Sequence, residues 1–189
     1  LSVSFRMYQH GLEQQELKVI SDLYLTARHG EIIAIAGSSG SGKSLLASAI
    51  LGILPDNATV QGHLHYKGQE LTPERQKMLR GTEIALVPQS VAYLDPLMKI
   101  GPQVDGAGKQ PLAEKRRKLF DRFHLPQQTE QLYPFQLSGG MARRVLVSTA
   151  LITDAELIIA DEPTPGMSLD QALEALTMFR EMADEGKAV

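Results

Sequence analysis

Apolar segments of two kinds recur along the chain. The first residues, LSVSFRMY, alternate apolar and polar side chains and predict a half-exposed strand, and 59–68 (TVQGHLHYKG) predicts an antiparallel edge strand. Continuous apolar runs occupy 32–37 (IIAIAG), 83–89 (EIALVPQ) and 156–161 (ELIIAD). Such runs are typical of strands that are buried on both faces of a sheet.

Helical periodicity fills the intervals between these strands. We expect helices over about 43–53, 73–80, 112–125, 141–152 and 168–186. The apolar face of the last helix is expected to bury Leu173, Leu176, Phe179 and Ala183. Buried strands with intervening helices indicate an α/β core.

A different pattern runs from 90 to 151. Residues 101–111 (GPQVDGAGKQP) have the composition of a flexible linker. The helix after them is expected to keep its basic residues opposite an apolar face made of Leu112, Leu119, Phe120 and Phe123. We therefore expect an inserted helical lobe here.

Composition and charge restrict the class of function. A chain of 189 residues indicates one domain with an inserted lobe, and its net charge of −3 provides no basic field to attract nucleic acid. The absence of cysteine excludes disulfides, thiolate zinc sites and cysteine nucleophiles. The sequence contains no run of about 18 apolar residues, so it predicts no membrane-spanning helix. Because the pattern starts inside a strand and stops at the expected opening of another, we expect a C-terminally truncated fragment.

The strongest chemical signal follows the apolar run 32–37. Its glycine-rich spacing, G-x-x-x-x-G-K-S, is met by Gly37, Ser38, Ser39, Gly40, Ser41, Gly42, Lys43 and Ser44. Glycines allow consecutive backbone N–H groups to point at phosphate oxygens, and the helix N-terminus adds positive potential. We expect Lys43 to reach the β- and γ-phosphates and the Ser44 hydroxyl to bind Mg²⁺. A flexible strand–helix turn is the alternative interpretation.

Two further strand ends carry polar groups. Asp161 and Glu162 follow the run 156–160, and Gln89 follows the run 83–87. Alone, each is more often a solvated strand end. Beside a phosphate-binding loop, Asp161 is expected to support Mg²⁺, Glu162 to orient or deprotonate the attacking water, and Gln89 to bind the metal or that water.

A second glycine-rich helix start, LSGG, follows the helical lobe. Ser138, Gly139 and Gly140 precede a helix, so Ser138 is either an ordinary N-cap or part of a second phosphate site. The chain offers no second nucleotide loop for that site. The second interpretation therefore requires a ligand held by another subunit.

Taken in order, GSSGSGKS, VPQS, LSGGM, LIIADEP and SLD resemble the motifs of the ATP-binding subunits of ABC transporters. The resemblance extends from about Val3 to the last residue. It implies a P-loop NTPase fold with an ATPase core at 1–89 and 152–189, an antiparallel β edge, and a helical lobe at 90–151 that carries the signature segment. GILP and QSVAYLDPLMKIG resemble the subgroup that serves oligopeptide, dipeptide and nickel importers.

The resemblance also implies roles for individual residues. Two such domains, identical or paralogous, would enclose two ATP molecules, each held by residues 37–45 of one subunit, up to Leu45, and by 138–140 of the other. Ser44, Gln89 and Asp161 would hold Mg²⁺, and Glu162 would be the catalytic base. Asp170 would cross the interface, and Tyr8, with Phe5 as a competitor, would stack on adenine.

The implied assembly is peripheral to a membrane. Integral membrane permease subunits would contact Gln89 and the helical lobe, at the cytoplasmic face of the inner (plasma) membrane. The implied activity is Mg²⁺-dependent ATP hydrolysis that drives uptake of nickel or of oligopeptides and dipeptides. The alternatives are a soluble ABC ATPase of DNA repair or translation and a non-hydrolysing regulatory domain.

Three features depart from the family pattern. Met141 stands where the signature usually has Gln, although the peptide and nickel subgroup tolerates Met there. The segment PGMS before Leu169 looks two residues longer than usual, which affects the alignment of Asp170. A histidine expected after the next strand has no counterpart up to Val189, and we expect it beyond that residue.

Overall fold

The computed structural model of the chain describes residues 1–9, 13–106, 112–164 and 168–189, without the side chains of 7–9, 13 and 14. The chain divides into two compact units, Leu1–Arg28 with Ile33–Arg80 and His29–Ile32 with Gly81–Val189. Each unit is described by itself. Among the described residues, no helix has the length and apolar character needed to cross a membrane.

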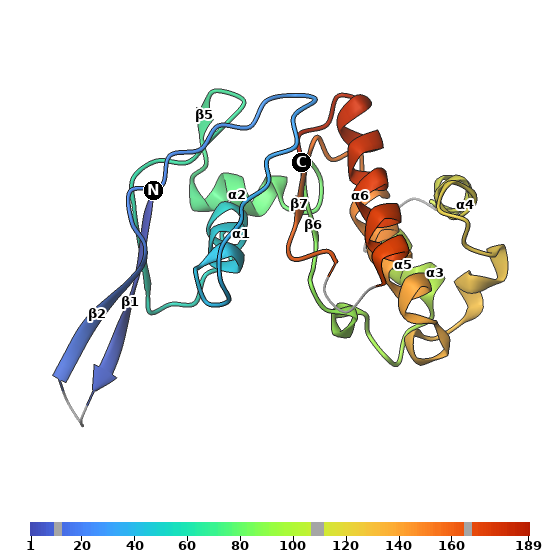
Figure 1. The fold of residues 1–189 in the computed structure, drawn as a ribbon, viewed down its shortest axis with the longest axis horizontal. Coiled ribbons are helices and arrows are strands. Elements are labelled where there is room, and N and C mark those ends of the chain that lie inside the picture. The colour runs from blue at the N-terminus through green and yellow to red at the C-terminus, as the bar shows by residue number, and fades with distance from the viewer. Residues whose placement is uncertain (10–12, 107–111, 165–167) are drawn as a thin grey trace. The chain divides into compact units, whose positions relative to one another are not determined.

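The first unit contains an antiparallel sheet with strand order β2-β1-β3. Its strands β1 and β2 lie side by side in Figure 1. The strands are β1 (Ser2–Gln9), β2 (Glu13–Ile20) and β3 (Ala58–Gln61). Val3 lies opposite Ile20 on one side and Val60 on the other. Val3 and Ile20 form a small core with Leu46 and Ala49, so the sheet packs against the following helix. These strands bear out the predicted β edge.

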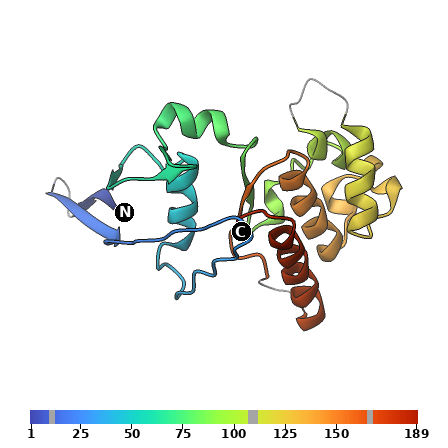
Figure 2. The same ribbon diagram turned by 90° about the horizontal axis from the view of Figure 1, so that it is seen from above.

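In the first unit, the C-terminal end of one helix is bonded by side chains of the next helix. They are α1 (Lys43–Leu51) and α2 (Pro73–Leu79), and a short hairpin of β4 (His65–Tyr66) and β5 (Gln69–Glu70) precedes α2. Gln76 Nε2 donates to the carbonyls of Ala49 at 2.8 Å and Ile50 at 3.2 Å, and Arg80 donates to that of Leu51. The side chains of α2 and its C-cap thus bond carbonyls at the C-terminal end of α1, where helical partners run out. The two helices are the cyan and green helical ribbons of Figure 2.

The second unit is built on two parallel strands. β6 (Ile84–Val87) pairs with β7 (Leu157–Ala160), and Ala188 forms a further parallel bridge to Leu157. Around them lie the helices α3 (Ile100–Asp105), α4 (Ala113–Arg122), α5 (Gly139–Leu151) and α6 (Leu169–Asp184). The 3₁₀ turns η1 (Val91–Tyr93), η2 (Gln127–Gln131) and η3 (Pro134–Gln136) connect them. A continuous core includes the fully buried Val87, Ile100, Phe120, Val145 and Met182.

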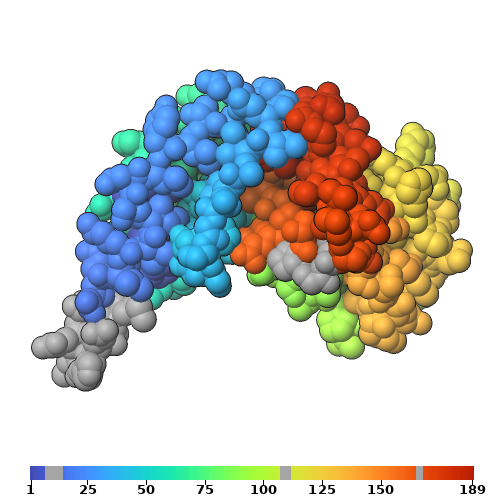
Figure 3. All heavy atoms as spheres, in the orientation of Figure 1, coloured from blue at the N-terminus to red at the C-terminus, as the bar shows by residue number. Residues whose placement is uncertain are grey.

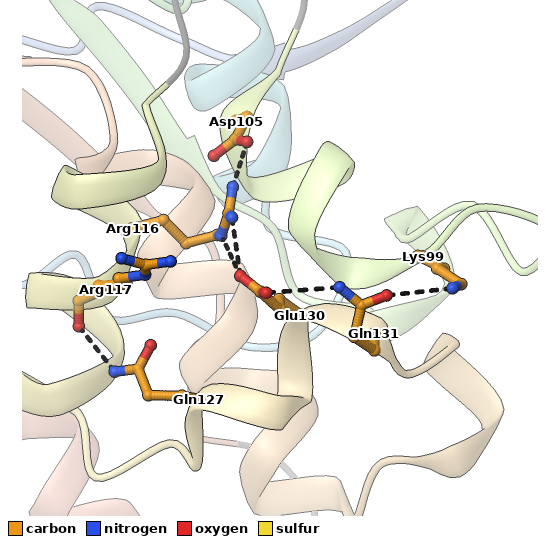
Figure 4. A network of polar contacts seen from close by, with 7 residues as sticks. All are labelled: Lys99, Asp105, Arg116, Arg117, Gln127, Glu130 and Gln131. Atoms are coloured by element: carbon orange, nitrogen blue, oxygen red, sulfur yellow. Dashed lines mark hydrogen bonds and ion pairs between the residues drawn. The ribbon is translucent and has the colours of Figure 1, made fainter.

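A polar network joins α3, α4 and η2 (Figure 4). The Arg116 side chain, only 10% exposed, pairs with Asp105 at the end of α3 and with Glu130 in η2 at 2.7 Å. The hydrogen bond from Arg116 is the main reason why the pKa of Glu130 is lowered. The prediction that the basic residues of this helix lie opposite its apolar face is wrong for Arg116, which is buried with Leu119 and Phe120 because its carboxylate partners come from neighbouring elements.

A second ion-pair cluster joins α4 to α6. Arg122 lies 3.4 Å from a carboxylate oxygen of Glu181 and 2.9 Å from one of Glu185. The surfaces of these helices adjoin in the space-filling view (Figure 3, yellow and red). The helices α4 and α6 are therefore linked by ion pairs, and both also contribute residues to the same apolar core.

Three expectations from the apolar pattern are wrong. Residues 32–37 form no strand, and Ile32 and Ile35 are 39% and 45% exposed, because within the described chain no neighbouring strand pairs with this run. Leu173 and Leu176 are about half exposed, since α6 instead buries the face made of Ala175, Met178, Phe179, Met182 and Ala183. Residues 101–105 belong to α3 rather than to a linker, because its Ile100 and Val104 are fully buried.

The junction of α1 with α2 gives a stability prediction. Gly52 has a φ of 65°, and a Cβ there would lie 2.5 Å from Gln76 Oε1. We expect Gly52→Ala to lower the free energy of unfolding by about 1–2 kcal/mol for the left-handed backbone and by about 1–3 kcal/mol more for the clash. Gly68→Ala is the matched control, because its φ is 72° and nothing lies within 4 Å. Equal losses in urea unfolding would contradict the proposed clash.

Candidate functional site

The glycine-rich loop of the first unit curls around the lysine that follows it. Lys43 Nζ donates to the carbonyls of Gly37 and Ser38, each at 3.0 Å, and Ser41 N–H donates to Ser38 O at 3.2 Å. Gly42 has a φ of 92°, and a Cβ there would lie 3.0 Å from Val19 Cγ1. Glycine at 42 therefore lets the loop approach β2 closely and turn directly into α1.

This loop has the geometry of an anion cradle. α1 begins at Lys43, and a hydrogen bond from Leu46 N–H to Gly42 O closes its first turn. A helix start of this kind directs backbone N–H groups and the positive end of the helix dipole toward an anion. The ammonium of Lys43, which bonds loop carbonyls here, is a cation that phosphate oxygens can bind at the same place.

In the second unit, the predicted polar residues meet at the carboxyl ends of β6 and β7. Val87 lies opposite Ala160, and Asp161 N–H donates to Val87 O at 3.0 Å. Beyond that pair, Gln89 Nε2 donates to Glu162 Oε2 at 2.5 Å. The parallel register thus brings together an amide and a carboxylate that are 73 positions apart in the sequence.

These groups suit two kinds of chemistry. An ionised carboxylate beside an amide can orient a water molecule and accept its proton. In this unit the amide oxygen of Gln89 and the Asp161 carboxylate are hard oxygen donors, which Mg²⁺ prefers, and the Ser44 hydroxyl of the first unit is a donor of the same kind. Because Gln89 turns its Nε2 toward Glu162, its oxygen is the atom that remains for a metal ion. The chemistry of each of these donors therefore fits Mg²⁺.

Ser138 begins the second glycine-rich helix as its N-cap. Its hydroxyl accepts from Met141 N–H at 3.3 Å, which bears out the capping interpretation. A Cβ on Gly139 would meet nothing within 4 Å, and one on Gly140 would lie 3.6 Å from Gln171 Nε2. A molecule can therefore approach the backbone at Gly139, next to the first turn of α6.

Asp170 lies in that first turn, where Ser168 caps the helix and Gln171 completes a capping box. Residues 165–167, part of the segment that we expected to be long, lie outside the described residues. The side chain of Tyr8 also lies outside them, although its backbone is in β1 opposite Gln14. Its competitor, Phe5, packs against the small core of the first unit.

Sequence reasoning missed Arg143. Its side chain donates from Nη1 to Pro88 O at 2.9 Å and from Nη2 to Gln89 O at 2.8 Å, and the residue is 7% exposed. Helical spacing carried the signal, because Arg143 is followed three, four and seven positions later by the buried Leu146, Val147 and Ala150. An arginine in line with a buried helix face needs buried acceptors.

The model of one protein family, ABC transporter, matches residues 20–165, which is more than half of the chain. The chain belongs to this family. The resemblance of the sequence motifs to the ABC transporter family is thereby confirmed, as is the P-loop NTPase fold class.

Named ABC transporter relatives are peptide transport proteins. The oligopeptide transport ATP-binding protein OppD of Salmonella typhimurium is 32% identical over 183 residues, which cover 90% of this chain and 55% of the relative. The dipeptide transport ATP-binding protein DppD of Lactococcus lactis subsp. cremoris is 31% identical, with 97% and 56% covered. The chain spans about half the length of these curated relatives.

A solved structure shows the same fold. The ATP-binding cassette MJ0796, described as a dimeric post-hydrolysis state bound to ADP and Pi, superposes with a TM-score of 0.79 at 25% identity. The match covers 98% of this chain and 84% of that chain. A second structure of MJ0796, described as a dimeric bacterial ABC transporter cassette, gives the same TM-score.

The curled loop gives a binding prediction. We expect Mg-ATP to bind the full-length protein and Lys43→Ala to weaken the affinity about a hundredfold or more, because a charged donor to phosphate is lost. Lys18→Ala, which removes an exposed lysine of β2, should leave the affinity unchanged. Isothermal titration calorimetry measures all three. Equal affinity in the wild type and Lys43→Ala would refute the assignment of the loop.

Proposed function

We propose that this chain is the ATP-binding and ATP-hydrolysing part of an ABC importer subunit for oligopeptides or dipeptides. The observation that carries the proposal is the contact between Gln89 and Glu162 at the ends of two parallel strands, in a chain that also holds a curled phosphate-binding loop. The peptide transport names of the relatives support the substrate class. Nickel is the second substrate that the sequence motifs allow.

In this proposal the chain's own residues divide the work of hydrolysis. Residues 37–45 hold the phosphates through backbone N–H groups and the ammonium of Lys43. Gln89 donates to Glu162 and thereby directs the carboxylate, and Glu162 orients the attacking water and accepts its proton. Ser44, Gln89 and Asp161 would hold Mg²⁺, which neutralises developing phosphate charge when bound.

We propose further that the site is completed by a second subunit, identical or paralogous. The open backbone at Gly139, the Ser138 cap and Gly140 would face the ATP of that partner, and Asp170 would cross the interface. The dimeric description of the MJ0796 structures supports this arrangement. Closure on ATP and opening after hydrolysis would then drive the transport cycle.

The remaining assignments rest on the transporter relatives. The core would comprise 1–89 and 152–189 and the helical lobe 90–151, and that lobe with Gln89 would contact integral permease subunits at the cytoplasmic face of the membrane. Tyr8 is proposed to stack on adenine, since Phe5 is engaged in packing. The named relatives are transport proteins, which favours an importer subunit over a soluble ABC ATPase of DNA repair or translation.

The role of Glu162 gives a prediction about assembly. We expect full-length Glu162→Gln to hydrolyse ATP about 10²–10⁴ times more slowly, because the general base is lost, and to accumulate as an ATP-bound dimer or as a pair with its sister subunit. Phosphate release and light scattering measure the two effects. Glu185→Gln removes an exposed carboxylate of the same unit and should behave as wild type. A monomeric Glu162→Gln protein at saturating ATP, with the sister present, would count against the two-subunit site.

A further inference from the structure

Arg143 is a buried cation whose bonds go to backbone carbonyls. Both of its terminal nitrogens donate to consecutive residues, Nη1 to Pro88 O at 2.9 Å and Nη2 to Gln89 O at 2.8 Å. Throughout the described residues, no carboxylate lies within ion-pair distance of Arg143. Burial accordingly lowers the pKa of its guanidinium.

A buried charge without a counter-ion opposes folding unless its hydrogen bonds compensate for lost hydration. The planar fork of arginine can bond two neighbouring carbonyls at once, whereas a lysine ammonium is a point donor without that fixed geometry. The contact therefore restrains the two peptide units that flank the Cα atom of Gln89, Pro88–Gln89 and Gln89–Ser90. Apolar packing alone would not set the direction of those two carbonyls.

The restrained segment carries the Gln89 side chain. Gln89 Nε2 donates to Glu162 Oε2 at 2.5 Å, so a continuous series of contacts runs from Arg143 through the Gln89 backbone to Glu162. At its other end, Arg143 belongs to α5, which begins one residue after the Ser138 cap. α5 is a single helix of 13 residues with Val145, Leu146 and Val147 buried.

We propose that Arg143 is a positioning residue that holds Gln89 in reach of Glu162 and links their geometry to the glycine-rich start of α5. The inference rests on the proposed function and deepens it, because it assigns a route between the surface offered to a partner's nucleotide and the carboxylate that handles water. A shift of α5 by a bound nucleotide is transmitted to Gln89 through two hydrogen bonds.

The kinetic test uses the full-length protein with any sister subunit. Arg143→Met should lower kcat about tenfold to a hundredfold, because small misplacements of catalytic groups have effects of that size. The affinity for Mg-ATP should stay within about twofold, since α1 and its loop are untouched. In a Gln89→Ala background, where the route is already broken, Arg143→Met should have almost no further effect on kcat.

Two further variants separate positioning from stability. Arg116→Met also removes a buried arginine, 9% exposed against 7% for Arg143, but its partners are Asp105 and Glu130 in the helical lobe. It should lower the melting temperature and leave kcat per folded molecule unchanged. Arg143→Lys, which keeps the charge but not the fork, should recover only part of kcat, and it provides the test if Arg143→Met does not fold.

Hydrogen exchange without nucleotide supplies a readout that does not depend on hydrolysis. The backbone amides of 89–92 should exchange at least about tenfold faster in Arg143→Met than in wild type, because opening of this loop no longer requires the two hydrogen bonds from Arg143 to break. Arg116→Met should leave these amides unchanged.

The possible outcomes distinguish a failure of the proposed role of Arg143 from a failure of the proposed ATPase function. Additive losses of kcat in the Gln89→Ala background, or unchanged exchange of the amides of 89–92, would overturn the role of Arg143 while ATP hydrolysis by the wild type still stands. A wild-type protein that binds ATP without hydrolysing it, even with its sister subunit, would overturn the proposed function itself. A non-additive kcat together with faster exchange supports the inference.

Discussion

The parallel pairing of β6 with β7 is the constraint on which the chemistry of the second unit depends. Parallel strands end at the same edge of a sheet, so the register that sets Val87 opposite Ala160 also places the residues after each strand together. Gln89 and Glu162 meet for that reason, and their contact needs no special loop length. A slip of one residue would turn the buried side chains to the opposite faces, which the core of the unit opposes.

The helix α5 supports this edge from one side. Its N-terminus is held by the Ser138 cap, and its buried face joins the same core as Val87 and Ile158. Next to that apolar face, Arg143 donates hydrogen bonds to backbone carbonyls of the loop after β6. In the first unit, the two ends of α1 also differ. Gln76 and Arg80 bond carbonyls at its C-terminal end, while the glycine-rich loop before its N-terminus stays exposed.

The parts that could be predicted from sequence are those in which local rules act alone. The glycine-rich loop, the helix starts at Lys43 and Leu169, and the pairing of carboxylates with a strand end all follow from backbone and capping preferences. The parts that could not be predicted depend on distant partners. Residues 32–37 have the composition of a buried strand but no paired neighbour within the described chain, and α6 turns a different apolar face inward because two faces of that helix are apolar. The contacts of Arg143 could not be predicted because the carbonyls that accept its hydrogen bonds are 54 and 55 positions away in the sequence.

The backbone at Glu162 shows why the surrounding contacts matter. Its φ of 42° is in the left-handed region, which costs a residue with a Cβ about 1–2 kcal/mol. The next residue is Pro163, and a residue before proline normally adopts an extended conformation, so this geometry is disfavoured twice. Such a strained backbone conformation persists only where several contacts from neighbouring groups hold it in place. The ladder bond from Asp161 N–H restrains the backbone just before Glu162, and the bond from Gln89 Nε2 restrains its side chain. Because Gln89 is in turn held by Arg143, the carboxylate's direction is a property of the whole strand edge and of α5, and not of Glu162 alone.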